Sequence, residues 1–233
     1  MAEKTLEEMR QAVAEIREKM AAAAREAGRD PAAVQLCAAC KTRTAQTIAA
    51  SAALPIDVFG ENHVQELCAN YDAGAYCGKP SHFIGHLQTN KIKKVLGRAS
   101  LIQSVDSEHL LLAIEKEAAK AGIVQDVLLE VNIGGEESKS GVSPDALEEL
   151  LLQIGQMSNV HVQGLMAIPP AAGSEKFLCE MQELYLDISA KKLDNIDMKI
   201  LSMGMSGDYA AAIRYGSTMV RIGSALFGAR KYT

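Results

Sequence analysis

The sequence predicts an α/β protein whose single domain, residues 1–233, is a (β/α)8 barrel, also called a TIM barrel. Short apolar runs typical of strands alternate with helical patterns from residue 34 onward, which implies a parallel sheet, and eight such runs occur. A length of 233 residues fits one barrel. The alternative is an open doubly wound sheet, which often carries G-x-G-x-x-G after its first strand, and that motif is absent here.

An amphipathic helix precedes the first strand. It covers about residues 5–27, and Gly28 followed by Pro31 supplies its end. A second helical pattern covers residues 143–157, where Ser143 is the predicted N-cap and Pro144 the predicted first helical residue. No linker, low-complexity tract or fixed-period repeat divides the chain. The predicted strands are 34–40, 56–60, 82–87, 101–105, 127–133, 162–168, 199–203 and 219–223.

Composition and charge narrow the class of protein. Apolar residues make up 48% and charged residues 23% of the chain, as in an ordinary folded protein. The net charge of −5 argues against nucleic acid as a partner. The charged amino terminus lacks the apolar core of a signal peptide, and no apolar run approaches the roughly 18 residues of a membrane span. We therefore expect a cytoplasmic protein that binds neither nucleic acid nor membranes.

The five cysteines are odd in number and lack the paired spacing of a disulfide framework, which favours a reducing compartment. Cys37 and Cys40 form a C-x-x-C, a spacing found in redox pairs and in half zinc sites. Both lie in a predicted strand, where residues three apart face opposite sides, and no second pair of ligands follows. We interpret them as structural residues.

His82 and His86 are the candidate metal ligands in the predicted third strand. On a strand they would face the same side roughly 13 Å apart, which is too far for one ion. No metal site is therefore predicted. The basic residues that follow are typical of a solvated helix face, although they could also attract an acidic partner or a free cofactor; they are Lys91, Lys93, Lys94 and Arg98.

Lys41 directly follows the uncharged run 34–40, so its stem leaves a nearly dry strand. In a barrel of this kind the chemistry lies at the carboxyl ends of the strands. A partly desolvated amine has a lowered pKa and can attack an aldehyde to form a Schiff base. The alternative is a lysine that emerges into water at a strand end, and position alone leaves both readings open.

Small hydrogen-bonding residues follow the last two predicted strands. Ser206 and Gly207 precede a helical pattern, and Gly223 and Ser224 come directly after the last strand. Barrels commonly build a phosphate site from these two loops, where backbone N–H groups at a helix start meet the anion. The stretch therefore predicts a phosphate site, with tight turns as the plainer explanation of the same residues.

Arg221 lies inside the last predicted strand, two residues before Gly223. An arginine that points into the barrel needs a partner. It could face a ligand, and beside a pyridine ring its charge would keep the ring nitrogen unprotonated. The alternative is a salt bridge with an Asp or Glu near the mouth of the barrel.

Several long motifs occur in a fixed order along the chain. With them the chain resembles the pyridoxal phosphate homeostasis proteins, which are related to the alanine racemase amino-terminal domain. The similarity covers nearly everything after the first helix. It implies a TIM barrel of the third PLP fold type, with pyridoxal 5′-phosphate (PLP) as the cofactor. The motifs are CKT at 40–42, GENHVQE at 60–66, HFIGHLQTNK at 82–91, GLMAI at 164–168 and SMGMSGDYAAAIRYGSTMVRIGSALFG at 202–228.

The resemblance also implies a role for individual residues. Lys41 would hold PLP as an internal aldimine, the Schiff base between its amine and the aldehyde of the cofactor. Cys40 and Ser81 depart from the family pattern, where we expect Ser and Trp, so ring packing near the third strand is expected to be looser. The remaining contacts would come from Ser206, Gly223 and Ser224 at the phosphate, Arg221 at the pyridine nitrogen, and Asn62, Met166 and Met203 around the ring.

Racemases of the alanine type need a lysine on one face of the substrate and a tyrosine from a second domain of the partner subunit. Here the chain ends at Thr233, and Tyr209 and Tyr215 fall in a helical pattern. We therefore expect a monomeric protein of PLP homeostasis that holds the cofactor without substantial turnover and passes it to apo-enzymes. The alternatives are a PLP-dependent amino-acid racemase or lyase with a rudimentary site, and a cofactor-free aldolase-like enzyme that uses Lys41 with a sugar phosphate.

Overall fold

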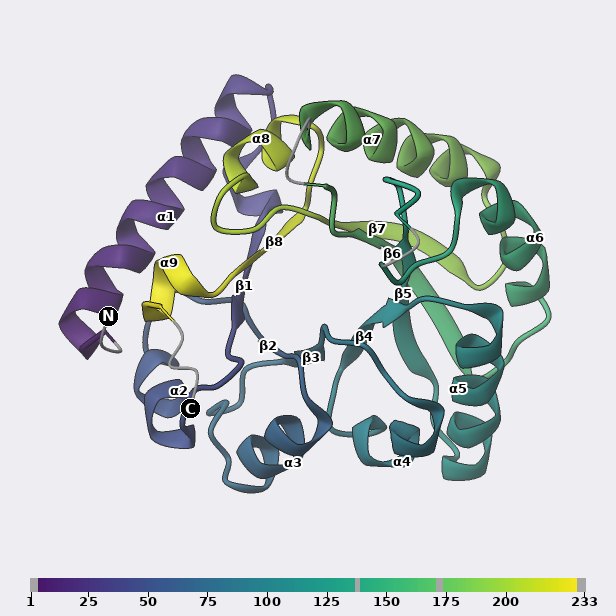
Figure 1. Ribbon diagram of the computed structural model, residues 1–233, viewed down its shortest axis with the longest axis horizontal. Coiled ribbons are helices and arrows are strands. Elements are labelled where there is room, and N and C mark those ends of the chain that lie inside the picture. Colours follow the sequence, from purple (N-terminus) through teal and green to yellow (C-terminus); the bar gives the residue numbers. More distant parts are fainter. Residues whose placement is uncertain (1–3, 137–138, 171–173, 230–233) are drawn as a thin grey trace.

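The computed structural model describes residues 4–136, 139–170 and 174–229. Eight parallel strands form a closed barrel in chain order, and β8 pairs with β1 (Figure 1). This confirms the predicted fold class and excludes the open doubly wound sheet. The strands are β1 (Gln35–Ala39), β2 (Val58–Glu61), β3 (Ser81–Phe83), β4 (Leu101–Val105), β5 (Gln125–Val131), β6 (Val160–Ala167), β7 (Ile196–Ser202) and β8 (Met219–Ile222).

Helices surround the barrel and connect its strands (Figure 1). The helix predicted over residues 5–27 is confirmed as α1, with Thr5 as its N-cap. All eight predicted strands are present, although β3 ends at Phe83, four residues before its predicted end. The helices are α1 (Leu6–Glu26), α2 (Ala45–Ser51), α3 (Val64–Asp72), α4 (Ile92–Val95), α5 (Glu108–Ala121), α6 (Pro144–Ile154), α7 (Ser174–Lys191), α8 (Tyr209–Arg214) and α9 (Ser224–Phe227).

The core has two parts because successive strand residues face opposite sides. One large cluster lies between the strands and the surrounding helices, and it includes Leu36, Phe59 and Leu165. Smaller clusters fill the interior of the barrel. One joins Cys37, Val58 and Met219, and the other joins Leu101, Leu128 and Met166. The interior is therefore packed, and any ligand has to bind at an end of the barrel.

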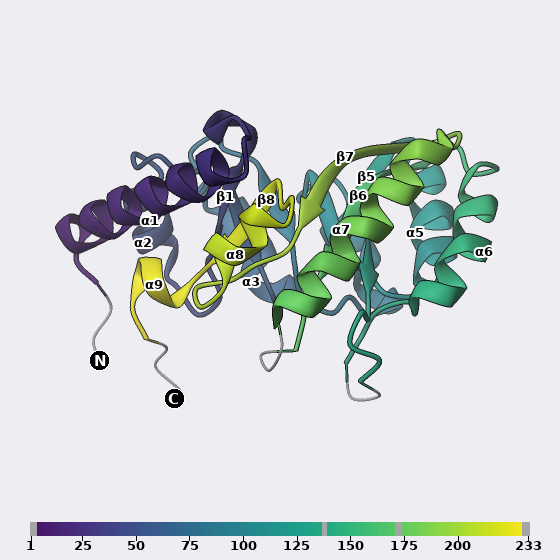
Figure 2. The same cartoon turned by 90° about the horizontal axis from the view of Figure 1, so that it is seen from above.

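Helix α1 lies beside the short helices α8 and α9 (Figure 2). Its N-terminus is fixed by a capping box in which Thr5 and Glu8 exchange side-chain and backbone hydrogen bonds. Lys4 Nζ donates to the carbonyl oxygen of Ala225 at 2.7 Å, and Arg29 Nη1 donates to that of Ile213 at 2.7 Å. The amino-terminal segment thus supports the two helices that follow β7 and β8.

Two glycines permit close backbone contacts that any side chain would block. Gly164 in β6 has a φ of 141°, and a Cβ there would collide with the carbonyl oxygen of Ile200 in β7. A Cβ on Gly85, after β3, would collide with the backbone of Asn62 after β2. Because Gly85 has no side chain, the Asn62 backbone can pack against it, and the carboxyl ends of β2 and β3 can lie close together.

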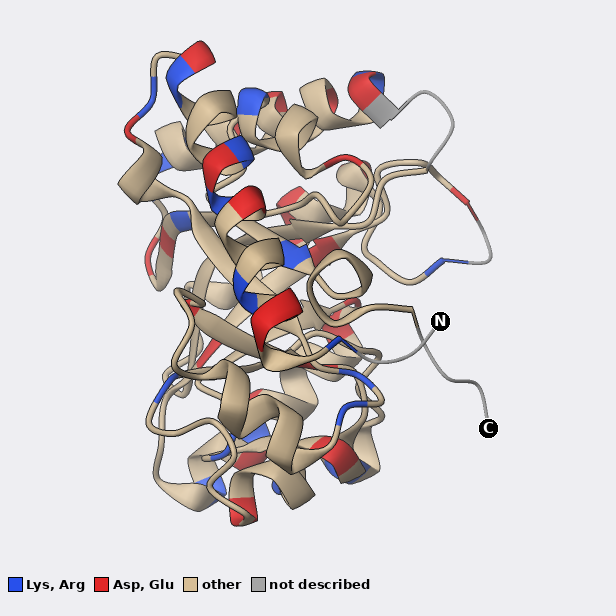
Figure 3. Ribbon diagram, turned by 90° about the vertical axis from the view of Figure 1, so that its left-hand side faces the viewer, with Lys and Arg blue, Asp and Glu red and all other residues tan. Residues whose placement is uncertain are grey.

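The outer surface carries charges of both signs. Figure 3 shows Lys and Arg interspersed with Asp and Glu over the helices on that side of the molecule. Within the described residues, no helix has the length and apolar character needed to cross a bilayer.

Candidate functional site

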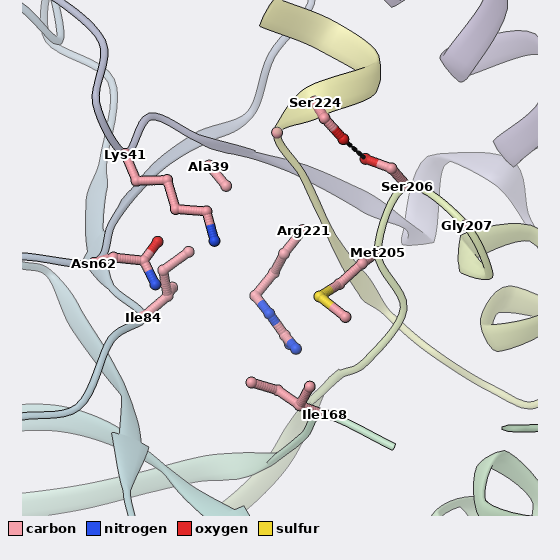
Figure 4. A pocket seen from close by; sticks show the side chains of 11 residues that line it. Ala39, Lys41, Asn62, Ile84, Ile168, Met205, Ser206, Gly207, Arg221 and Ser224 are labelled. Atoms are coloured by element: carbon pink, nitrogen blue, oxygen red, sulfur yellow. Dashed lines mark hydrogen bonds between the residues drawn. The ribbon is translucent and has the colours of Figure 1, made fainter. Parts of the chain in front are cut away.

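A cavity of about 230 Å³ opens at the carboxyl ends of the strands. Six of the eight residues predicted to bind the cofactor line it: Lys41, Asn62, Ser206, Arg221, Gly223 and Ser224. They come from the ends of β1, β2, β7 and β8, far apart in the sequence. The other lining residues, which the sequence did not single out as cofactor contacts, are Ala39, Ile84, Ile168, Met205 and Gly207 (Figure 4).

Lys41 enters the cavity from the turn that ends β1. The backbone N–H of Cys40 donates to the carbonyl oxygen of Gly60 at 2.8 Å, and that of Arg43 donates to the carbonyl oxygen of Cys40 at 2.9 Å. Thr42 has a φ of 66°, a left-handed conformation that is strained for a β-branched residue. Such strain is common at functional sites. The turn directs the amine of Lys41 into the cavity (Figure 4).

Two hydroxyl groups meet on the side of the cavity formed by the last two loops. Ser224 Oγ lies 3.3 Å from Ser206 Oγ, and the backbone N–H of Ala225 donates to Ser206 Oγ at 3.4 Å. The loop is fixed by Asp208, whose carboxylate accepts from the N–H of Met205 at 2.7 Å. A Cβ on Gly207 would meet no atom within 4 Å, so the space beside this loop is open. The hydroxyls of Ser206 and Ser224 can donate hydrogen bonds to a small anion.

Arg221 points from β8 into the mouth of the barrel and is 5% exposed. Its Nη1 donates to the carbonyl oxygen of Ser202 at 2.8 Å and to Ser202 Oγ at 2.7 Å, and its Nη2 donates to the carbonyl oxygen of Ala167 at 2.9 Å. Burial lowers the pKa of the guanidinium from its ordinary value. The salt bridge weighed above as an alternative is not formed within the described residues, since every hydrogen bond of this side chain goes to a neutral group.

A chain of buried hydrogen bonds continues from Arg221 into the barrel. Ser202 Oγ donates to Gln103 Oε1 at 2.7 Å, and Gln103 Nε2 donates to His82 Nδ1 at 2.9 Å. His82 is 6% exposed, and burial lowers its pKa to about 3. The imidazole is therefore neutral at physiological pH, which lets Nδ1 accept. The hydrogen bonds run in one direction, from Arg221 through Ser202 and Gln103 to His82. Bonds aligned in this way polarise and strengthen one another.

Glu61 is a buried acid directly behind the cavity wall. Its Oε1 accepts from Asn70 Nδ2 at 2.8 Å and from Tyr76 Oη at 3.1 Å, whereas Oε2 has no partner within the described residues. Burial raises the pKa of this carboxyl to about 7, and the charge of Glu66 adds to the rise. The next residue, Asn62, lines the cavity, and its Oδ1 is also buried without a hydrogen-bond donor.

Met166 and Met203 do not line the cavity. Met166 packs with Leu101 and Leu128 inside the barrel, and Met203 belongs to the large helix-facing cluster. Their places at the wall are taken by Ile168 and Met205, each two residues farther along the chain. Met166 and Met203 are thus in the predicted segments but away from the cavity wall, and their contact with the cofactor stays a prediction.

The two departures from the family pattern lie away from the cavity. Ser81 is at the amino end of β3, where its hydroxyl donates to the carbonyl oxygen of Arg98 at 2.7 Å. Cys40 is fully buried in the helix-facing cluster, and its Sγ contacts the carbonyl oxygen of Ala38. Neither side chain reaches the cavity wall, and the looser ring packing expected near the third strand stays a prediction.

The paired cysteines and the paired histidines of the sequence lie apart from one another in the structure. Cys37 and Cys40 belong to different clusters on opposite faces of β1, and burial raises the pKa of the Cys37 thiol to about 12. His82 lies inside the barrel, whereas His86 lies beyond the end of β3 and pairs with Asp106 at 3.0 Å. The two histidines therefore do not share a site. Within the described residues, no three potential ligands cluster around a metal position.

Comparison with known proteins places these features in a family context. The alanine racemase N-terminal domain family matches residues 11–231. A relative from Aquifex aeolicus named pyridoxal phosphate homeostasis protein is 42% identical over 219 residues, which cover 92% of this chain and 95% of the relative.

Solved structures of similar chains show the same barrel. An unknown protein from Bifidobacterium adolescentis is 36% identical with a TM-score of 0.89, covering 95% of both chains. PipY from Synechococcus elongatus, solved with PLP bound, is 29% identical with a TM-score of 0.78, covering 91% of this chain and 100% of that one. Alanine racemase from Corynebacterium glutamicum, at 15% identity and a TM-score of 0.70, shares the fold over 61% of its length.

Proposed function

The chain belongs to the alanine racemase N-terminal domain family, in which its relatives are named pyridoxal phosphate homeostasis protein, and from this membership we propose that it binds PLP and serves PLP homeostasis. Lys41 would hold the cofactor covalently as a Schiff base. The observation that carries the proposal is the convergence of one lysine amine, one buried guanidinium and a pair of hydroxyls on a single cavity.

The cavity fits the chemical groups of PLP. The aldehyde needs a primary amine, and Lys41 supplies it at the wall. The phosphate needs several donors, and the hydroxyls of Ser206 and Ser224, beside Gly223 and the open Gly207, can provide them. The buried acceptor Asn62 Oδ1 lacks a donor, as expected of a wall that faces a polar ligand.

Arg221 would face the pyridine nitrogen and keep it unprotonated. Two backbone carbonyls and Ser202 hold its Nη atoms, which fixes the plane of the guanidinium. A positive charge beside the nitrogen disfavours its protonation and so weakens the ring as an electron sink. This supports a protein that holds the cofactor over one that uses it for turnover.

We propose that the chain is not a racemase, because a second base is missing from the cavity. Tyr209 and Tyr215 are at the two ends of α8, and neither is among the residues that line the cavity. Loss of the α-proton of amino acids in deuterated water tests this point. Exchange that depends on PLP would favour the racemase alternative instead.

We also propose that the protein acts as a monomer in the cytoplasm and delivers PLP to apo-enzymes. One chain supplies the lysine, the buried guanidinium and the pair of hydroxyls on which the proposal rests, which supports a monomer. Sedimentation equilibrium tests the monomer, and transfer of PLP to an apo-aminotransferase in a coupled assay tests delivery. A dimer, or a recovery rate no faster than with free PLP, would contradict the respective claim.

Titration with PLP tests the proposed function directly. The wild-type protein should develop a visible absorption band with saturable, one-to-one stoichiometry. Lys41→Ala should lose this band because no amine remains to condense with the aldehyde. Lys93→Ala, which removes an exposed lysine from α4, is the matched control and should behave like the wild type. Equal bands in all three proteins would overturn the assignment of Lys41.

A further inference from the structure

A second cavity of about 340 Å³ adjoins the first at the mouth of the barrel. The two cavities share Asn62, Ile84 and Ile168 as a common wall. The second cavity extends away from the Ser206–Ser224 side, toward the ends of β3 and β5. Its polar lining residues outside the common wall are His86, Glu130, Asn132, Lys139 and Ser140.

Glu130 is the unusual residue of this second cavity. It is 7% exposed, yet its carboxylate has no hydrogen bond or ion pair with any described residue. A buried carboxylate in this condition carries a large desolvation cost unless a donor reaches it. The cavity is where such a donor can enter, since Glu130 forms part of its lining.

Three of the other polar side chains of this cavity have partners. His86 pairs with Asp106, and Lys139 pairs with Glu136. Asn132 Nδ2 donates to the carbonyl oxygens of Glu136 and Lys139 at 2.9 and 3.2 Å. Among the described residues, Glu130 is therefore the charged lining residue of this cavity that has no partner.

A nearly buried carboxylate that lines a cavity without a described partner calls for a ligand that brings donors and a positive charge. A primary ammonium group has three N–H donors and a positive charge that matches the carboxylate. A quaternary ammonium has the same charge and no N–H donor, so it would leave the carboxylate without a hydrogen bond. We propose that the second cavity is a binding site for small primary amines, with Glu130 as the residue that holds the ammonium group.

The site would respond to pH through Glu130. Burial raises the pKa of this carboxyl to about 7, and the charge of Asp106 adds to the rise while Arg221 and His86 lower it. Lys139 also faces the cavity. Below pH 7 the carboxyl binds a proton and loses its attraction for an ammonium. Primary amines stay charged through this range, so their affinity should rise between pH 6 and pH 8.

The test uses the full chain as purified, treated with borohydride so that any carbonyl bound at Lys41 can no longer exchange with an amine. Ethanolammonium and choline are titrated separately by isothermal calorimetry at pH 6, 7 and 8. Ethanolammonium should bind about tenfold more tightly than choline at pH 8, because hydrogen bonds to a charged group contribute about 1.5 to 3 kcal/mol. Equal affinities would overturn the proposal without any variant.

The variant Glu130→Gln keeps the shape of the side chain and removes its charge. It should bind ethanolammonium about tenfold more weakly at pH 8 and lose the dependence on pH. Glu18→Gln, on the exposed face of α1, is the control and should match the wild type. Unchanged binding in Glu130→Gln would also overturn the proposal. The outcome does not depend on whether PLP binds, since the second cavity is present in the chain itself.

Discussion

Arg221 illustrates how a single residue of the site depends on neutral partners. A guanidinium inside a barrel is costly to bury, and the expected remedy is a carboxylate. Here the hydroxyl of Ser202 and two carbonyl oxygens take that place, and Gln103 and His82 extend the chain behind them. Because none of the described acids forms a salt bridge with it, the positive charge of Arg221 remains available to a ligand.

Removal of the Ser202 hydroxyl should therefore weaken PLP binding. Ser202→Ala leaves one Nη1–H of Arg221 and the Oε1 of Gln103 without their partner, and each unsatisfied group costs about 1–3 kcal/mol. We expect PLP affinity to fall about tenfold in an absorbance titration. Ser100→Ala, at the amino end of the barrel, is the control and should retain affinity. Equal PLP affinities in the two variants would show that the hydrogen bonds behind Arg221 do not contribute to PLP binding.

Glu61, like Glu130, is a residue through which stability should depend on pH. Its pKa is raised from 4.5 to about 7 in the folded protein, so the folded state binds the proton more tightly than the unfolded state does. The resulting stabilisation is fully present below pH 4.5 and is lost as the pH rises through 7. The neutral His82, whose pKa is lowered, contributes with the opposite sign below pH 6.5.

The variant Glu61→Gln separates these contributions. The amide keeps an oxygen for Asn70 and Tyr76 but cannot ionise. From pH 5 to pH 8 the wild type should lose about 2 kcal/mol more of its free energy of unfolding than the variant does. Urea denaturation at pH 5, 6, 7 and 8 measures both curves, with Glu18→Gln as the exposed control. Parallel curves for wild type and Glu61→Gln would show that Glu61 does not titrate in this range.

At the scale of elements, the strand ends decide which side chains reach the site. Short apolar runs between helical patterns predicted all eight strands, and residues after β1, β2 and β8 line the cavity as expected. At the end of β6 and after β7, Ile168 and Met205 line the cavity, whereas Met166 packs inside the barrel and Met203 packs against the helices. The sequence of a strand does not specify where the strand stops and its loop begins, so it does not specify which of these neighbouring residues reaches the cavity.

Contacts between distant strands were beyond the sequence for a different reason. Ser202, Gln103 and His82 stand on three strands, and only the closed register brings their side chains together. Polar residues inside apolar runs were the available signal, since Gln103 interrupts the fourth strand. The hydrogen-bond partner of each of these polar residues depends on how the closed barrel aligns its strands.

Gly164 allows β6 and β7 to pair closely at the point where their register shifts. Gly164→Ala would place a methyl group against the carbonyl oxygen of Ile200 at an unfavourable φ of 141°, so we expect a loss of about 3 kcal/mol or more in the free energy of unfolding. Gly155→Ala is the control. Its backbone is helical, with a φ of −58°, and no atom lies closer than 3.7 Å to the added Cβ.

Urea denaturation of the two glycine variants provides the comparison. Gly155→Ala should stay within about 1 kcal/mol of the wild type, because alanine fits helical backbone without strain. Similar losses in both variants would mean that the close approach of β6 and β7 can relax. In that case the register shift would not depend on Gly164.

At the scale of the whole molecule, the barrel explains how residues 41, 62, 206, 221 and 224 come to one cavity. All lie at the carboxyl ends of parallel strands, and a closed sheet of eight brings those ends into one ring. Helix α1 supports the ring from outside through α8 and α9. The sequence predicted this arrangement, but the residues alone left Lys41 equally compatible with a solvated lysine.

The attachment of PLP to Lys41 is tested most directly by borohydride reduction of the PLP-loaded protein, followed by peptide mass spectrometry. We expect one pyridoxyl phosphate group per chain, located on the peptide that contains Lys41 and absent from the Lys41→Ala protein. A modification spread over exposed lysines, or a sugar fragment in place of the pyridoxyl group, would show that Lys41 does not carry PLP.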